Sequence, residues 1–139
     1  MKTFLYYIGK PKDSNLNAVA DDFVRRASRF SACEMREVNP KKFSPFGQHP
    51  SAKTVFLDPE GEALDTARFV KLFEDGERYG RDLVFAVGGH DGLPPAWRRD
   101  ADQLLSLSRL TFPHEMARAM LAEQIYRAFA ILRGHPYPR

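Results

Sequence analysis

The stretch Leu83-Val84-Phe85-Ala86-Val87-Gly88-Gly89-His90-Asp91-Gly92-Leu93-Pro94 decides the fold. Its first five residues are apolar without alternation, which is typical of a strand buried on both faces of a parallel sheet. Two glycines follow directly, and they let the backbone turn sharply and approach a ligand where a Cβ atom would stand in the way. Ligands of open α/β sheets bind at the carboxyl ends of such strands. The sequence therefore predicts a small-molecule site at this turn, with a plain strand-to-helix turn as the alternative.

Hydrophobic patterning on both sides of this strand predicts the remaining regular elements. Strands are expected over residues 3–8, 33–38, 53–58, 82–87 and 103–108. Helices are expected from Ser14 or Asn15 to Phe30, from Asp65 or Thr66 to Tyr79, from Pro94 to Asp100, and from Pro113 to Gly134. This order predicts one domain over residues 1–139, of the α/β class, with three layers and a mostly parallel sheet.

Two segments are expected to be irregular. Residues 39–52 contain three prolines, which argues against a regular helix, and Phe43 and Phe46 are expected to anchor this loop. Residues 59–62 (Pro-Glu-Gly-Glu) are expected to form a turn. Trp97, in the short helix, is expected to pack against the core or against a partner chain.

Composition narrows the class of protein. The chain has 139 residues, 43% hydrophobic and 28% charged, which suits one globular core and is too polar for a membrane protein. The single cysteine, Cys33, allows no intramolecular disulfide; we expect a buried strand residue and a cytoplasmic protein. The apolar start is better explained as a strand than as a signal peptide, because it is short. A net charge of +3 is compatible with an RNA partner, although many proteins without one are as basic.

Several common chemistries find no motif in the sequence. The four histidines are isolated and no cysteine pair exists, so no zinc site is predicted. The glycine turn lacks the Lys-Ser/Thr of a phosphate loop, and no G-x-S-x-G nucleophile elbow occurs. Hydrolytic, metal-dependent and covalent catalysis are therefore unsupported.

Four motifs, taken in order, carry a family resemblance. They are the glycine turn with its strand (83–92), Leu-Ser-Leu-Ser-Arg-Leu-Thr-Phe-Pro-His (105–114), Ala-Glu-Gln-Ile-Tyr-Arg-Ala (122–128) and His-Pro-Tyr (135–137). Together they resemble the RlmH family of SPOUT-class methyltransferases, which act on large-subunit ribosomal RNA. The resemblance covers nearly the whole chain, and the set is far more specific than any one motif.

The resemblance implies a fold and an activity that composition and periodicity do not reveal. It implies a sheet whose C-terminal part is tied in a trefoil knot, the SPOUT or α/β-knot arrangement. It implies S-adenosylmethionine as methyl donor, no metal, and a homodimer. The implied reaction is methylation of N3 of a pseudouridine in a stem-loop of 23S ribosomal RNA, within the assembled 70S ribosome in the cytoplasm.

The resemblance also implies which residues bind the cofactor. Carried onto matching positions, they are Leu57, Gly88, Gly89, Leu107, Ser108, Arg109, Leu110, Thr111 and Phe112. The leucines and the phenylalanine would supply apolar walls, and backbone groups of the 107–112 loop would read the adenine edge.

Four further residues are candidates for catalysis. His114 follows the cofactor loop, and a neutral imidazole there could accept the N3 proton; alternatively it only hydrogen-bonds near the helix start. Glu123 and Arg127 have counterparts near the family's site, but at a spacing of four they are equally an intrahelical pair. Tyr137 in the tail could stack on a base.

Basic residues near both ends are candidates for RNA contact. Arg139 in the tail could hold a phosphate, and Lys10 and Lys12 lie in the loop after the first strand. A disordered terminus is the alternative for the tail. An unusually wide apolar band on the last helix favours a dimer interface.

The chain departs from the family pattern in two places. Relatives usually carry a lysine-rich helical segment where this chain has the shorter, proline-rich residues 39–52. Pro138 stands where the family's tail often has histidine. Two other functions therefore stay open: a catalytically inactive ribosome- or RNA-binding module of the same fold, and a generic nucleotide-binding α/β protein.

Overall fold

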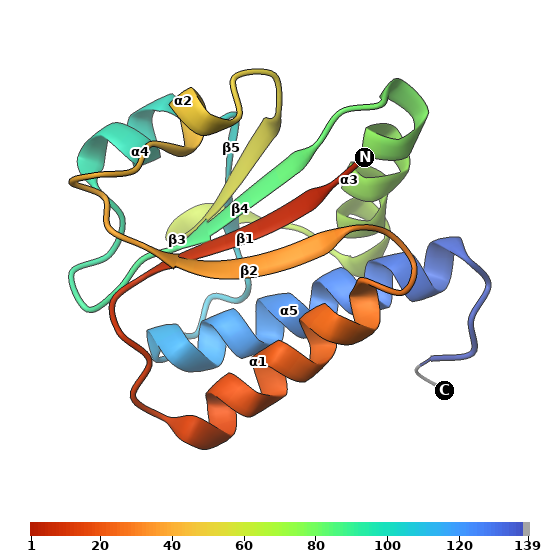
Figure 1. Cartoon of the computed structure of the whole chain (residues 1–139), viewed down its shortest axis with the longest axis horizontal. Helices are drawn as coiled ribbons and strands as arrows, with labels where there is room; N and C mark the ends of the chain where they lie inside the picture. The colour runs from red at the N-terminus through yellow and green to blue at the C-terminus, as the bar shows by residue number, and fades with distance from the viewer. Residues whose placement is uncertain (138–139) are drawn as a thin grey trace.

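Five parallel strands form the centre of the protein in the computed structural model, which describes residues 1–137 (Figure 1). The strands are β1 (Thr3–Ile8), β2 (Cys33–Val38), β3 (Lys53–Ala63), β4 (Leu83–Val87) and β5 (Gln103–Ser106). Their order across the sheet is β2-β1-β4-β3-β5, and each pair of neighbours runs parallel. The predicted α/β class and parallel sheet are confirmed.

Helices cover both faces of this sheet. On one face lie α1 (Ser14–Ala27), α3 (Thr66–Tyr79) and α5 (His114–Leu132), and on the other lie the short helices α2 (Pro45–Gln48) and α4 (Pro95–Asp100) (Figure 1). The three predicted layers are therefore present. Among the helices of the described part, none has the length and apolar character needed to cross a lipid bilayer.

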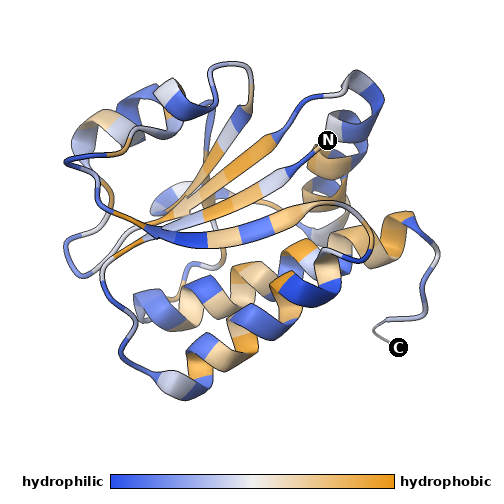
Figure 2. Ribbon diagram, viewed as in Figure 1, coloured by the Kyte–Doolittle hydropathy of each residue, from blue (hydrophilic) through white to orange (hydrophobic). Residues whose placement is uncertain are grey.

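Side chains alternate between the two faces of the central strands and pack into two separate hydrophobic cores. Leu5 and Phe85 point to the side of the three long helices, whereas Tyr6 and Ala86 point to the side of the short ones. Figure 2 shows hydrophobic residues concentrated on the middle of the sheet. The central strand β4 is buried along its whole length, and it contains no polar residue.

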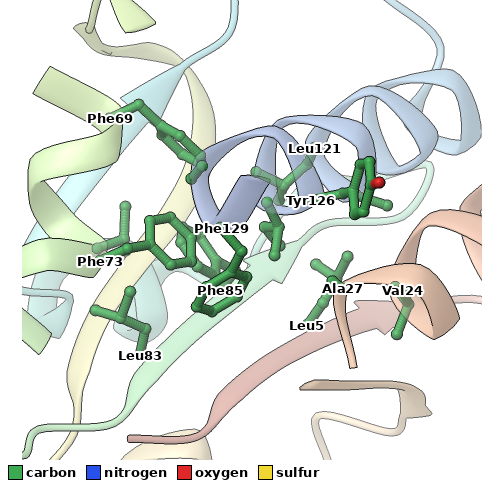
Figure 3. Close-up of a cluster of buried hydrophobic side chains, with 14 of the residues drawn as sticks. Leu5, Val24, Ala27, Phe69, Phe73, Leu83, Phe85, Leu121, Tyr126 and Phe129 are labelled. Carbon is green, nitrogen blue, oxygen red and sulfur yellow. The ribbon is translucent and has the colours of Figure 1, made fainter. Parts of the chain in front are cut away.

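Aromatic rings join the long helices to the sheet in the larger core (Figure 3). Phe73 of α3 stacks on Phe85 of β4, with ring centroids 5.8 Å apart. The same ring meets Phe129 of α5 edge to face at 5.0 Å. Full burial of one such side chain stabilises the folded state by roughly 1.5–3 kcal/mol, so these contacts hold α3 and α5 firmly against the sheet.

The smaller core confirms two predicted anchors and corrects one segment. Phe43 and Phe46 pack against it, and Trp97 is 5% exposed within it. Residues 45–48 nevertheless form a helical turn inside the predicted loop. Proline is compatible with the first position of a helix, and the Ser44 hydroxyl caps the turn by accepting from the Gly47 amide.

Two further local predictions are wrong. The cap of α1 is Asp13, whose carboxylate accepts from the Leu16 amide, rather than Ser14 or Asn15. Cys33 is only half-buried, because β2 is an edge strand; burial among its neighbours still raises the pKa of its thiol to about 12.

The predicted turn at residues 59–62 is also wrong, because β3 continues to Ala63. Leu57 pairs with Leu105 of β5, and so does Glu62, so residues 58–61 are extruded as a bulge. We call this segment the 58–61 bulge. A bulge bends its strand and redirects side chains, and this one lies beside the site described below.

The apolar band of α5 is used mostly inside the chain. Leu121, Ile125, Ala128 and Phe129 are fully buried, whereas Met116 is 40% exposed. The helix packs against α1, α3 and β4 together, so three neighbours account for the width of the band. The band by itself therefore no longer indicates a dimer interface.

Candidate functional site

A cavity of about 390 Å³ lies where strands β4 and β5 end, beside the middle of β3. Its walls come from Leu57 of β3 and the start of the 58–61 bulge, from the glycine turn after β4, from the segment after β5, and from the first turn of α5. Residues 88–89 and 107–112, which are far apart along the chain, are thus brought together. The position is the one at which open α/β sheets bind their ligands.

Most of the predicted cofactor residues line this cavity. They are Leu57, Gly88, Gly89, Leu107, Ser108, Leu110, Thr111 and Phe112. Arg109 is absent from the lining and is exposed to solvent. Leu110 lies at the cavity but is 73% exposed, so it forms part of the rim and not a closed wall.

The glycine turn is required by the protein's own backbone. A Cβ atom on Gly88 would lie 2.4 Å from the carbonyl carbon of Gly92, and one on Gly89 would lie 2.8 Å from the carbonyl oxygen of Ile8. The Gly92 amide donates to the Gly89 carbonyl at 3.0 Å and closes the turn. The close approach that demands glycine here is therefore between backbone segments, which the sequence argument had assigned to a ligand.

Two serines brace the loop after β5. The Ser106 hydroxyl donates to the Ser108 carbonyl at 2.7 Å, and the Ser108 hydroxyl accepts from the Leu110 amide at 3.0 Å. Both bonds lie within residues 106–110. They fix backbone groups of the 107–112 segment at the cavity.

His114 is the first residue of α5 and lies at the inner end of the cavity. It also borders a small hollow shared with Lys10 of the β1–α1 loop. Lys10 and Lys12 are both exposed, and the predicted RNA contact of this loop would therefore lie next to His114.

Glu115 is a functional candidate that the sequence argument missed. Its carboxylate is buried and accepts from the backbone amides of Lys12 and Asp13, each at 3.0 Å, and from the Asn17 side chain at 3.1 Å. These bonds, led by the one from Asp13, lower the pKa of Glu115. An acidic residue in the first turn of a helix is unremarkable in sequence, so no signal pointed to this contact.

Arg118 completes the support of the β1–α1 loop. It is 2% exposed, its guanidinium lies 3.8 Å from the ring centroid of Tyr7, and it donates to the side-chain oxygen of Asn17. Buried charges need such partners. The loop that carries Lys10 is thereby tied to α5 beside His114.

Glu123, Arg127 and Tyr137 come together, but away from His114. Arg127 and the Tyr137 hydroxyl each donate to Glu123 Oε2 at 2.6 Å. Burial, followed by the bond to Glu123, raises the pKa of Tyr137 to about 12, so its phenol stays protonated. Nine residues of helix separate Glu123 from His114, roughly 13 Å along the axis. Glu123 borders a second cavity, of about 490 Å³, shared with the other side of residues 105–108.

The tail is packed against the protein up to Tyr137. The ring of Tyr137 meets Tyr126 edge to face at 4.7 Å, and the Arg26 guanidinium lies 4.5 Å from the Tyr126 centroid and 5.3 Å from that of Tyr137. A disordered terminus is therefore wrong for residues 135–137. Arg139, a predicted RNA contact, and Pro138 lie outside the described residues.

Metal-ligating side chains do not gather in the described part. Within residues 1–137, no three His, Cys, Asp or Glu side chains come close enough to hold an ion.

Comparison with known proteins identifies the family. A family model described as "Predicted SPOUT methyltransferase" matches residues 1–138. The chain belongs to the SPOUT methyltransferase family. A relative in Solibacter usitatus, named "Ribosomal RNA large subunit methyltransferase H", is 60% identical over 139 residues and is covered completely, as is this chain. A relative of the same name in Sorangium cellulosum is 38% identical over 143 residues, covering 99% of each chain. This SPOUT methyltransferase therefore falls in the RlmH branch, as its four motifs predicted.

Solved structures share the fold of this SPOUT methyltransferase. A putative RNA methyltransferase from Bacillus anthracis superposes with a TM-score of 0.63 at 13% identity, covering 99% of each chain. An AdoMet-bound rRNA methyltransferase from Sinorhizobium meliloti gives 0.58 at 13% identity, covering 91% of this chain and 56% of that one. At these identities the likeness concerns the fold alone.

Proposed function

We propose that this protein transfers a methyl group from S-adenosylmethionine to N3 of a pseudouridine in 23S ribosomal RNA, within the assembled ribosome. The observation that carries the proposal is the cavity at the ends of β4 and β5, beside the 58–61 bulge of β3, because it gathers the matching cofactor motifs into one site. Full-length relatives named as large-subunit ribosomal RNA methyltransferases support the RNA substrate.

The cavity fits S-adenosylmethionine in size and chemistry. Its volume of about 390 Å³ falls in the range of small-molecule sites. Apolar side chains such as Leu57, Leu93 and Leu105 face it, alongside backbone groups of the braced loop. Leu57, Gly88, Gly89, Leu107, Ser108, Leu110, Thr111 and Phe112 would hold the cofactor, and a contact from Arg109 at the cavity mouth stays a prediction. The AdoMet-bound neighbour from Sinorhizobium meliloti supports this choice of ligand.

The protein's own task is to orient the base and remove one proton. The cofactor supplies an electrophilic methyl group on a positive sulfonium. The target nitrogen must lose its N3 proton, and His114 is our proposed acceptor because its imidazole lies at the cavity. Lys10, beside the same hollow, and Lys12 are proposed to hold RNA phosphates.

Glu123, Arg127 and Tyr137 are proposed to contact the RNA rather than the reacting nitrogen. Their distance from His114 within one chain argues against direct proton transfer at the same atom. Arg127 and Arg26 present positive charge beside aromatic rings, a combination that suits a stacked base and its phosphate. Arg139 is proposed to extend this contact.

Three properties of the whole protein follow from the family and are proposed with it. The protein works as a homodimer, acts in the cytoplasm where ribosomes are found, and has its C-terminal segment knotted. The knot can be tested by pulling both ends in a single-molecule experiment. A knotted chain extends to a shorter contour length than its residue number allows, and a full-length extension would exclude the knot.

The decisive experiment measures methylation of the 23S ribosomal RNA. Mass spectrometry of 23S fragments should show one methyl group missing from cells that lack the protein and restored on complementation. Isothermal titration of the pure protein with S-adenosylmethionine should give saturable heat.

The same measurements separate the alternatives. The shortened 39–52 segment is the argument for a catalytically inactive module. Such a module would sediment with ribosomes and leave the RNA unmethylated. A generic nucleotide-binding protein would neither sediment with ribosomes nor methylate their RNA, and intact methylation in the deleted cells would refute our proposal.

A further inference from the structure

Arg98 of α4 binds two carboxylates of the 58–61 bulge. Its Nε donates to Asp58 Oδ2 at 2.6 Å, and a terminal nitrogen donates to Glu60 Oε2 at 3.2 Å. Asp58 Oδ1 in turn accepts from the Glu60 amide at 2.9 Å. The bulge is therefore closed on itself and clamped from outside by a single guanidinium.

This clamp joins two walls of the cavity that come from neighbouring strands. Asp58 and Pro59 line the cavity on the side of β3. On the other side the glycine turn continues through Leu93 into α4, whose Trp97 is buried in the smaller core. The helix is thus anchored by Trp97, and the next residue reaches across to the bulge. Arg98 is the side chain that connects the wall formed by β3 to the wall that follows β4.

The two arms of the clamp differ in strength. The Asp58 side chain is 8% exposed, so loss of its partner would leave a carboxylate nearly buried and unpaired. The Glu60 side chain is 83% exposed, and such pairs contribute little. An unpaired Asp58 would turn toward water and carry the bulge away from the cavity, so the Asp58 arm holds the shape of the wall.

We propose that Arg98 is a positioning residue that sets the affinity of the cavity for S-adenosylmethionine by holding the 58–61 bulge in place. The proposal rests on the proposed function, since it takes that cofactor as the ligand. Arg98 does not line the cavity, so its effect passes through Asp58 and Pro59. Displacement of a binding wall by a fraction of an ångström is enough to weaken a preorganised site.

A matched pair of variants tests the proposal. Arg98→Gln removes the clamp. Arg99→Gln removes the neighbouring arginine on the same helix, which within residues 1–137 forms an ion pair with exposed Asp100 alone. Titration calorimetry with S-adenosylmethionine should show Arg98→Gln binding on the order of tenfold more weakly, and Arg99→Gln binding like the wild type. In methyl transfer to ribosomes, the KM for the cofactor should rise with kcat at saturating cofactor little changed.

Further variants guard against a trivial loss of folding. Arg98→Lys keeps the charge but cannot form the two-armed contact, so its affinity should fall between those of wild type and Arg98→Gln. Glu60→Gln should bind within about twofold of wild type, because its arm is exposed. The Tm of every variant is measured alongside.

The outcomes separate this inference from the function it rests on. Wild-type protein that gives no heat with S-adenosylmethionine refutes the proposed function. If wild type binds, and Arg98→Gln and Arg98→Lys bind as tightly as Arg99→Gln, Arg98 has no positioning role. A lower Tm with unchanged affinity would mean that the clamp serves stability alone, and would equally overturn the inference.

Discussion

At the scale of single residues, Gly88 has a reason to be glycine that can be tested without a ligand. In Gly88→Ala the new Cβ would lie 2.4–2.6 Å from backbone atoms of Gly92 and Leu93, which cannot move without opening the turn. We expect a lower Tm and weaker binding of S-adenosylmethionine together. Gly47→Ala is the control, because its Cβ would meet only Ser44, at 3.8 Å. Equal behaviour of the two variants would contradict the close-packing explanation.

His114 can be distinguished from a purely structural residue by what its loss leaves intact. If His114 accepts the N3 proton, His114→Ala should slow methyl transfer on the order of 10²–10⁴-fold while the affinity for S-adenosylmethionine stays near that of wild type. Transfer rates from labelled cofactor and titration calorimetry measure the two quantities. A His114→Ala variant that methylates ribosomes at the wild-type rate would remove the imidazole from the mechanism.

Single residues also show how much of the site could be predicted from the sequence. The motifs predicted that Leu57, Gly88 and Phe112 would share a site, and they do line one cavity. Glu115 was not predicted, because its partners are backbone amides of Lys12 and Asp13, about a hundred residues away along the chain. A pattern along one strand or helix carries no information about such a contact.

At the scale of elements, Glu115 couples the start of α5 to the β1–α1 loop, and this coupling should depend on pH. The carboxylate has a lowered pKa in the folded state, led by the bond from the Asp13 amide. Its stabilisation is therefore fully present above the unfolded pKa of about 4.3 and is lost as the pH falls through the folded value. Glu115→Gln should reduce the free energy of unfolding by about 1–2 kcal/mol at pH 7, with the difference from wild type shrinking below about pH 4.

Urea unfolding at several pH values measures this difference. Glu74→Gln is the control, because Glu74 is half exposed on α3 and lies 3.9 Å from its only ion-pair partner in the described part, Lys71. A Glu115 effect that is as small as the control, or that grows in acid, would contradict the assignment.

The regular helices and strands could be predicted from the sequence, whereas the interruptions within strands could not. The strand at Leu83–Val87 and the helix beginning with His114 follow from hydrophobic runs and periodicity, which act locally. The 58–61 bulge has turn-like residues, yet β3 resumes its pairing with β5 on the far side. Whether such a segment turns away or bulges depends on the neighbouring strand, which local sequence does not describe.

At the scale of the whole molecule, the proposed homodimer makes a direct prediction. Sedimentation equilibrium should give a mass of twice 15.9 kDa at micromolar concentration. Val19 on α1 and Met116 on α5 are apolar and exposed, at 45% and 40%, so a dimer that uses these helices should be weakened by Met116→Glu. Ile131→Glu, at 45% exposure nearer the other end of α5, is the control. A monomeric wild type would exclude the dimer.

The overall architecture was predictable because the hydrophobic patterns that determine it repeat along the chain. The arrangement of the candidate catalytic residues was not predictable. The resemblance made His114, in motif 105–114, and Glu123, in motif 122–128, candidates for catalysis. In the structure, His114 and Glu123 border different cavities. Nine residues of helix α5 therefore hold His114 and Glu123 apart in space, although the two residues are close in the sequence.

The strand order β2-β1-β4-β3-β5 has a consequence for synthesis on the ribosome. The cavity takes its walls from residues 57 to 117, and α5, which forms one of them, also closes the core against α1. A partly translated chain can build β1, α1 and β2 early, yet it holds no completed pocket. The cavity forms only when α5 has left the exit tunnel, so a nascent polypeptide that stops before α5 cannot bind the small molecule that the cavity accepts.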